Sequence, residues 1–295
     1  KYCYFVITVV GVNSQKEIDM SRTMPATPLF QTNGVPNAAL VELLKLTGIH
    51  VPADIERIHE ATQENWLKKG LTPAQIQEEH GHIASQATPL FRALGLNGVP
   101  TVKPGRHEWA IQMGSMYTGL HRRFAYAVQQ WDEGVTWDKY CILTSSNRPR
   151  QKDGKESDEI IVTPVSGALP FFSGWTEPDV LPENEAELAK LVLSQIGHHR
   201  RWNIDYEHVT IASGNGAANT TETLRAFAFD HDPRGDSLLI ISSQPHILRQ
   251  GIEAAVVLGN RFKSYVVTGY DMPETQNVTK KLDELAKLIH LLFTV

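Results

Sequence analysis

From about residue 107 onward, short apolar runs alternate with segments of helical periodicity, and this alternation restricts the fold more than any other feature of the chain. The runs are "EWAIQM", "KYCILT", "HVTIA", "SLLIIS" and "KSYVVT". Parallel strands joined by crossover helices produce such an alternation. The sequence therefore predicts an α/β protein with a doubly wound, mainly parallel sheet of five strands.

The segments between the runs carry apolar stripes at helical spacing, as in "LHRRFAYAVQQW", "NEAELAKLVLSQIG" and the stretch from Val278 to Leu292. Residues three or four apart share one face of a helix, so each stripe is a packing surface. Three further amphipathic helices are expected within residues 37–48, 52–70 and 72–95. The predicted organisation is an N-terminal strand and helical region at 1–107, followed by an α/β domain at 108–295. The long insertion at 151–182 is expected to be a lid or an inserted hairpin.

The first residues, "KYCYFVITVVGVNSQK", allow two interpretations. A basic residue, an apolar run and the small-residue end from Val12 to Ser14 resemble the remnant of a signal peptide, which implies export. The β-branched and aromatic residues equally suit a buried strand, and the run is too short to span a bilayer. We expect an ordered strand and a cytoplasmic protein, with export as the alternative.

The composition argues against several classes of partner and site. With a net charge of −5 over 295 residues and the two signs interspersed, the chain has no concentrated basic face for nucleic acid or anionic lipid. Cys3 and Cys141 lie far apart and support no disulfide framework. Cys141 lies within the apolar run "YCIL" and is expected to be a buried free thiol.

In an open parallel sheet, ligands bind beyond the carboxyl ends of the strands, near the point where the strand order reverses. Four loops follow the first four predicted strands, namely "GSMYTGLHRR", "SSNRPR", "SGNGAANTTET" and "SSQPHILR". Their small residues, hydroxyls, amides and arginines suit an anion held at helix starts. We therefore predict a small anionic ligand, phosphorylated or nucleotide-like, at this edge of the sheet.

Two of these loops also have purely structural interpretations. Asn219 and Glu222 in "NTTE" can form a capping box at a helix start without any ligand. In the fourth loop, Pro245 suits the first position of a helix, which places His246 and Arg249 in its first two turns. There His246 is a candidate base and Arg249 a candidate phosphate or carboxylate ligand, or both are ordinary residues of a helix start.

The motifs for metals and cofactors are weak. "EEHGH" at Glu78 to His82 and "GHHRRW", with His198 and His199, lack the spaced set of ligands that a metal site needs. "GNGAAN" has neither the dinucleotide fingerprint nor the lysine of a phosphate loop, and no Gly-x-Ser-x-Gly elbow occurs. We predict no metal site, and the sequence does not specify a cofactor.

In their order, the motifs from about residue 108 to 293 resemble the YdcF/SanA/ElyC-like bacterial family, whose domain is largely of unknown function. The family pattern has a strand with a Gly-rich turn, a helix with "L..R", a strand ending in Ser-Gly, a "sEA" helix, and helix starts "NT.EN" and "TS..H..R". The stretches that match here are "LHRR", "ILTSS", "NEAELAKLVL", "ANTTET" and "ISSQPHILR".

The resemblance implies a Rossmann-like fold with a polar, charged cleft at the strand ends, but it implies no named reaction. Family members have been linked to envelope and peptidoglycan-related processes, and one is suggested to bind S-adenosylmethionine. This chain departs from the family pattern at Gly214, where the family has Glu, and at Thr223, where it has Asn. If that Glu is catalytic in the family, this chain binds a similar ligand without turning it over.

Two hypotheses about function follow. In the first, the protein is a hydrolase or transferase acting on the anionic ligand, with proton-transfer residues His246, Glu222 and Glu185. The residues expected to bind and orient the ligand are Arg123, Ser145, Asn219, Thr220, Ser243 and Arg249. In the second, the protein is a non-catalytic module that binds a ligand or a protein partner, with the N-terminal helices and the insertion as the partner surface.

Overall fold

The computed structural model describes residues 6–7, 27–31, 33–71, 75–145, 147–197, 202, 206–211, 219–271 and 277–294, and for 6–7 and 206–211 the backbone alone. The strands are β1 (Val6–Ile7), β2 (Gly105–Met113), β3 (Val135–Ser145), β4 (Tyr206–Ile211), β5 (Gly235–Ser243) and β6 (Phe262–Tyr270). The α-helices are α1 (Ala38–Leu46), α2 (Ile55–Asn65), α3 (Ala84–Ala93), α4 (Tyr117–Asp132), α5 (Asp158–Ile161), α6 (Glu185–Ile196), α7 (Thr220–His231), α8 (Ile247–Leu258) and α9 (Val278–Thr294). Two short 3₁₀ helices are η1 (Gly81–Ile83) and η3 (Gly259–Arg261).

The chain forms two compact units, and each is built from segments far apart in the sequence. The first unit comprises Lys1–Ile7, Pro100–Ser243 and Glu253–Tyr270, and the second comprises Thr8–Val99, Gln244–Ile252 and Asp271–Val295. This division differs from the one expected at residue 107, because α9 and the beginning of α8 belong with the N-terminal helices.

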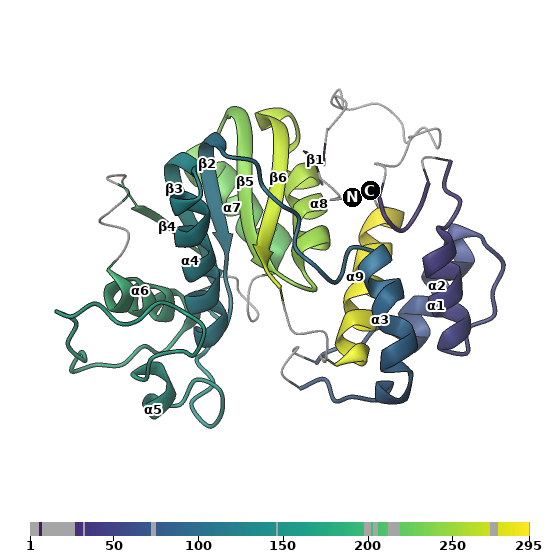
Figure 1. The fold of residues 1–295 in the computed structure, drawn as a ribbon, viewed down its shortest axis with the longest axis horizontal. Helices are drawn as coiled ribbons and strands as arrows, with labels where there is room; N and C mark the ends of the chain where they lie inside the picture. Colours follow the sequence, from purple (N-terminus) through teal and green to yellow (C-terminus); the bar gives the residue numbers. More distant parts are fainter. Residues whose placement is uncertain are drawn as a thin grey trace. The chain divides into compact units, whose positions relative to one another are not determined.

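The first unit is an α/β unit around one sheet with the strand order β1-β6-β5-β2-β3-β4 (Figure 1). β2 to β6 pair in parallel, and their order is that of a doubly wound sheet, which reverses between β2 and β5. The α/β class predicted from the alternation is confirmed. The described sheet has six strands instead of the expected five, because β1 adds an antiparallel edge on β6 through Val6 and Val266.

The predicted apolar stripes form the core of the first unit. Leu238 to Ile241 of β5 are all fully buried, as expected for a central parallel strand covered on both faces. Leu120, Phe124 and Ala127 of α4 are buried, whereas Trp131 is only partly buried. Cys141 of β3 is a buried free thiol, as predicted.

The insertion at 151–182 contains α5 and a series of turns but no strand, so the expectation of an inserted hairpin is wrong. An antiparallel bridge between Pro149 and Asn184 closes its base, and Arg150 N–H donates to Glu183 O at 2.9 Å. The insertion therefore leaves and re-enters the unit at one point. Its role as a lid stays a prediction.

The second unit is helical, with α9 packed against α2, α3 and η1. Its core includes Leu40, Ile58 and Phe91 from the N-terminal helices and Leu282 and Leu285 from α9. α1 and α2 lie within the predicted segments, but the third predicted helix, at 72–95, is reduced to η1 and α3. No helix in the described part of the chain is both long and apolar enough to cross a bilayer.

Candidate functional site

Four buried or mostly buried charged side chains gather in the first unit, where β2 and β3 end. Arg123 extends from α4, Glu185 is the first residue of α6, and Arg148 and Glu156 lie on the segment that follows β3. We call these four residues the edge cluster. They lie at the carboxyl ends of parallel strands, where doubly wound sheets bind ligands.

Arg123 joins the two strands between which the sheet order reverses. Its Nη1 donates to Met113 O at 2.8 Å and to Gly114 O at 2.6 Å, just where β2 ends, and its Nη2 donates to Ser243 Oγ at 2.8 Å, at the end of β5. The guanidinium is buried, which lowers its pKa. Its Nε is also buried and has no hydrogen-bond partner among the described residues.

Glu185 is held beside Arg123 by the backbone around β3. Its Oε2 accepts from Ser145 N–H at 3.0 Å, and its own N–H donates to Arg148 O at 3.0 Å. Burial raises the pKa of this carboxyl, and the opposing effects of Arg148, Ser145 N–H and Arg123 do not cancel that increase. A Cβ atom at Gly114 would lie 2.6 Å from Glu185 Oε1, so the turn after β2 requires glycine.

Glu156 fills the place where the sequence predicts an anionic ligand. Its side chain is fully buried, and Oε1 accepts from Tyr117 N–H, at the first residue of α4, at 3.0 Å. The same oxygen accepts from Arg148 Nη2 at 3.1 Å, and Oε2 accepts from Gln151 N–H at 2.9 Å. The insertion therefore supplies a carboxylate to the start of α4, the helix end that favours negative charge.

Gln195 ties the insertion to α4 and α6 through a buried polar network. Its Oε1 lies 3.1 Å from Tyr117 Oη and 2.8 Å from His121 Nε2, and its Nε2 donates to Ile161 O at 2.7 Å. Burial lowers the pKa of His121 to about 4, so the imidazole is neutral near pH 7. This network beside the edge cluster is therefore uncharged near pH 7.

The start of α7 forms the capping box that the sequence allows. Asn219 Oδ1 accepts from Glu222 N–H at 2.9 Å, and Glu222 Oε2 accepts from Asn219 N–H at 2.9 Å. Thr220 is the first helical residue. The structural interpretation of Asn219 and Glu222 is therefore confirmed. Their predicted functional roles stay predictions, and Gly214 lies outside the described residues.

His246 and Arg249 belong to the second unit, where both contact Glu284 of α9. The prediction that Pro245 is the first residue of a helix is wrong, because α8 begins at Ile247 and both Pro245 and His246 lie in the turn before it. His246 Nδ1 lies 3.0 Å from Glu284 Oε2, and Arg249 Nε donates to Glu284 Oε1 at 2.6 Å. Glu284 was not found by sequence reasoning.

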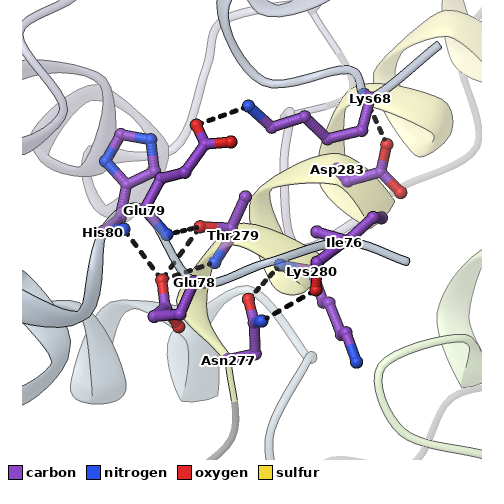
Figure 2. Close-up of polar contacts among 9 residues, drawn as sticks. All are labelled: Lys68, Ile76, Glu78, Glu79, His80, Asn277, Thr279, Lys280 and Asp283. Atoms are coloured by element: carbon purple, nitrogen blue, oxygen red, sulfur yellow. Dashed lines mark hydrogen bonds and ion pairs between the residues drawn. The ribbon is translucent and has the colours of Figure 1, made fainter. Parts of the chain in front are cut away.

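The "EEHGH" motif caps α9 through Glu78 and Glu79 (Figure 2). Glu78 Oε1 accepts from Thr279 Oγ1 at 2.9 Å and from His80 N–H at 2.8 Å, and Glu78 Oε2 accepts from Val278 N–H. Glu79 N–H donates to Thr279 Oγ1 at 2.8 Å. These contacts explain why the third predicted helix begins late, since residues 76–80 lie across the start of α9 instead of continuing a helix.

Metal ligands do not gather in the described part of the chain: no group of three or more His, Cys, Asp or Glu side chains there could hold an ion. His198 and His199 of the "GHHRRW" motif lie outside the described residues.

Sequence reasoning missed three residues that the structure places at these sites. Arg148 lies within the quoted loop "SSNRPR" and could have been singled out as a cation after a strand. Glu156 and Glu284 carry no local signal, because each meets its partners only through tertiary contacts. Of the predicted residues, the structure brings together Arg123, Ser145, Glu185 and Ser243.

No protein-family model and no curated protein sequence matches the chain. A structural likeness links it to the signal recognition particle 54 kDa protein from Aeropyrum pernix K1 in complex with GDP, with 15% sequence identity and a TM-score of 0.24. The match covers 88% of this chain and 62% of that chain. A likeness of this size supports no argument about fold or function.

Proposed function

We propose that the protein is an enzyme that binds a small anionic ligand, phosphorylated or nucleotide-like, at the edge cluster. One observation carries the proposal. Arg123 Nε and Arg148 Nη1 are buried N–H groups without a hydrogen-bond partner among the described residues. The positive charges of both guanidinium groups act to lower the pKa of Glu185. A buried donor of this kind calls for an ion, a water or a ligand. Gln112, Trp137 and Arg150 of the same unit also have one, but Arg123 Nε and Arg148 Nη1 belong to the guanidinium groups that lower the pKa of Glu185.

Glu185 is the proton-transfer residue of this proposal. A carboxyl whose pKa is raised by burial keeps its proton nearer to neutral pH and can serve as a general acid. Guanidinium groups bind phosphate and carboxylate oxygens with directed hydrogen bonds. The edge cluster thus combines anion-binding and proton-donating groups, as the first hypothesis requires.

A non-catalytic module is the second candidate function, and a specific observation favours it. Glu156 already occupies the start of α4, and both Nη atoms of Arg123 bind internal oxygen atoms. A cluster whose charges are largely satisfied internally can bind a ligand without turning it over.

A thermal-shift panel tests the anion site. The probes are inorganic phosphate, adenosine diphosphate, a sugar phosphate and S-adenosylmethionine, applied to wild type, Arg148→Gln and the control Arg106→Gln. Arg106 is exposed and pairs with Asp138 near the amino ends of β2 and β3. A probe at 100 times its dissociation constant stabilises the wild type by about 2.7 kcal/mol. We expect this shift to persist in Arg106→Gln and to disappear in Arg148→Gln, and an equal shift in all three proteins contradicts the site.

Turnover separates the two candidate functions. Hydrolysis of a phosphomonoester such as p-nitrophenyl phosphate, or transfer from the probe that binds, is measured for wild type, Glu185→Gln and the control Glu187→Gln. Glu187 lies exposed in the same turn of α6. Turnover lost only in Glu185→Gln supports the enzyme, whereas binding without turnover in the wild type favours the non-catalytic module.

A further inference from the structure

His246 and Glu284 form a contact that resembles the orienting half of a proton-transfer site. His246 immediately precedes α8, and Glu284 extends from the middle of α9. Nδ1 of the ring lies 3.0 Å from Glu284 Oε2, while Glu284 Oε1 accepts from Arg249 Nε at 2.6 Å. The two carboxylate oxygens thus face different residues near the start of α8: Oε1 accepts from Arg249, and Oε2 lies in contact with His246.

Glu284 stays ionised because its surroundings are cationic. Its side chain is only 3% exposed, and burial by itself raises the pKa. Arg249 in the first place, with smaller contributions from the contact with His246 and from Lys287, outweighs burial and holds the pKa of Glu284 well below its usual range. The neighbouring Asp283 pairs with Lys287 at 2.6 Å. Glu284 is thus a fixed negative charge and accepts hydrogen bonds without donating any.

An ionised carboxylate beside Nδ1 selects the tautomer of the ring. Because Glu284 can only accept, the ring proton is favoured on Nδ1, which leaves the lone pair on Nε2. Nδ1 is buried, and its 3.0 Å contact with Glu284 Oε2 lies outside hydrogen-bond geometry, so Nδ1 has no hydrogen-bond partner among the described residues. Two facing lone pairs at this distance would repel each other, so the contact still favours the proton on Nδ1. Of the whole His246 side chain, 24% is exposed to solvent. The exposed part of the side chain therefore lies away from Nδ1.

We propose that Glu284 is a positioning residue that holds His246 with Nε2 as the proton acceptor of a second reactive site. Nε2 takes a proton from a water molecule or a ligand hydroxyl, and Glu284 balances the imidazolium charge that forms. The inference goes beyond the edge cluster and does not depend on it, because all its atoms belong to the second unit.

Chemical modification of the full-length folded protein tests the reactivity of Nε2. Diethyl pyrocarbonate acylates the unprotonated nitrogen of histidine, and peptide mass spectrometry measures the rate at each site at pH 7. We expect Glu284→Gln to slow modification of His246 by on the order of tenfold, the lower end of the loss caused by removing a carboxylate behind a metal-bound histidine. Exposed His50 of the same unit serves as the internal reference, and its rate should not change.

Asp283→Asn is the matched control, because it removes a buried carboxylate from the adjacent position of α9. It should leave the His246 rate unchanged. An unchanged His246 rate in folded Glu284→Gln, or an equal decrease in Asp283→Asn, overturns the proposal.

The tautomer gives a second readout that needs no variant. Long-range ¹H–¹⁵N spectra of the wild type distinguish the two neutral forms of the His246 ring. The proposal requires the Nδ1–H form, and the Nε2–H form overturns it. This measurement decides the question even if Glu284→Gln does not fold.

Discussion

Two buried glutamates, Glu185 in the first unit and Glu284 in the second, respond to burial in opposite ways. Burial disfavours the charged form of both. At Glu185 this effect prevails and raises the pKa, although Arg148 and Arg123 oppose it, whereas at Glu284 the cations prevail and lower the pKa. Glu284 has Arg249 Nε at 2.6 Å and His246 Nδ1 at 3.0 Å, but the hydrogen bond shown for the Glu185 carboxylate comes from a backbone N–H.

The difference teaches that burial alone does not decide how a carboxyl functions. Glu284, with the Arg249 guanidinium in direct contact, becomes a fixed charge that can orient another group. Glu185 is stabilised in its neutral form and can release a proton. Four predictions test this contrast.

The largest effect is expected for Glu284→Gln, which leaves Arg249 without its buried counterion. Removing one partner of a buried pair costs about 3–5 kcal/mol. Because the folded-state pKa of Glu284 lies below its ordinary value of 4.5, this stability is fully present above pH 4.5 and is lost as the pH falls through the folded-state pKa. Urea unfolding of wild type and variant across pH measures it, and a pH-independent difference contradicts the assignment of a fixed charge.

Gly114→Ala tests how tightly the Glu185 carboxyl is enclosed. The new Cβ meets Glu185 Oε1 and Leu143 O, both at 2.6 Å. Overpacking of this kind costs about 1–3 kcal/mol. Urea unfolding should show this loss for Gly114→Ala but not for Gly154→Ala, because a Cβ at Gly154 has only an ordinary contact at 4.0 Å. Equal stability of the two variants means that Glu185 is not confined.

Asn219→Ala provides an exposed glutamate, Glu222, as a reference for the two buried ones. Glu222 forms its capping box at an exposed helix start. Loss of the cap costs about 1 kcal/mol of unfolding free energy. Thermal or urea unfolding measures it, and the loss should also appear in Glu222→Ala. A change well above this size in either variant points to a role beyond capping.

The smallest effect, with the opposite sign, is expected for Glu185→Gln. A glutamine oxygen keeps the bond from Ser145 N–H, and the cost of a buried charge disappears. We expect the variant to be more stable at pH 7 by less than about 1 kcal/mol, the scale of one hydrogen bond. Because the folded-state pKa is raised, wild-type stability decreases as the pH rises from 4.5 through the folded-state pKa, so the difference should vanish near pH 3. Destabilisation at pH 7 contradicts the sign of the shift.

The sequence by itself determined the α/β class, since period-two and period-3.6 patterns reflect local geometry that the chain carries everywhere. It also placed the central strands, the stripes of α4 and α9, and the capping box at Asn219, because each depends on residues close together in the chain. Local patterns did not predict the segment at 72–95 correctly. Its helical spacing predicts one helix, but Glu78 instead caps the start of α9.

Only the tertiary structure decided which charges meet. Glu156 reaches the start of α4 from 39 residues away, and Arg249 meets Glu284 across 35 residues. Such pairs leave no periodic signal, because the separation of the partners along the chain is set by intervening loops and helices. Glu185 and Glu284 therefore appear equivalent in the sequence. Only the direct ionic contact at Glu284, compared with the backbone contact at Glu185, gives their carboxyls opposite pKa shifts.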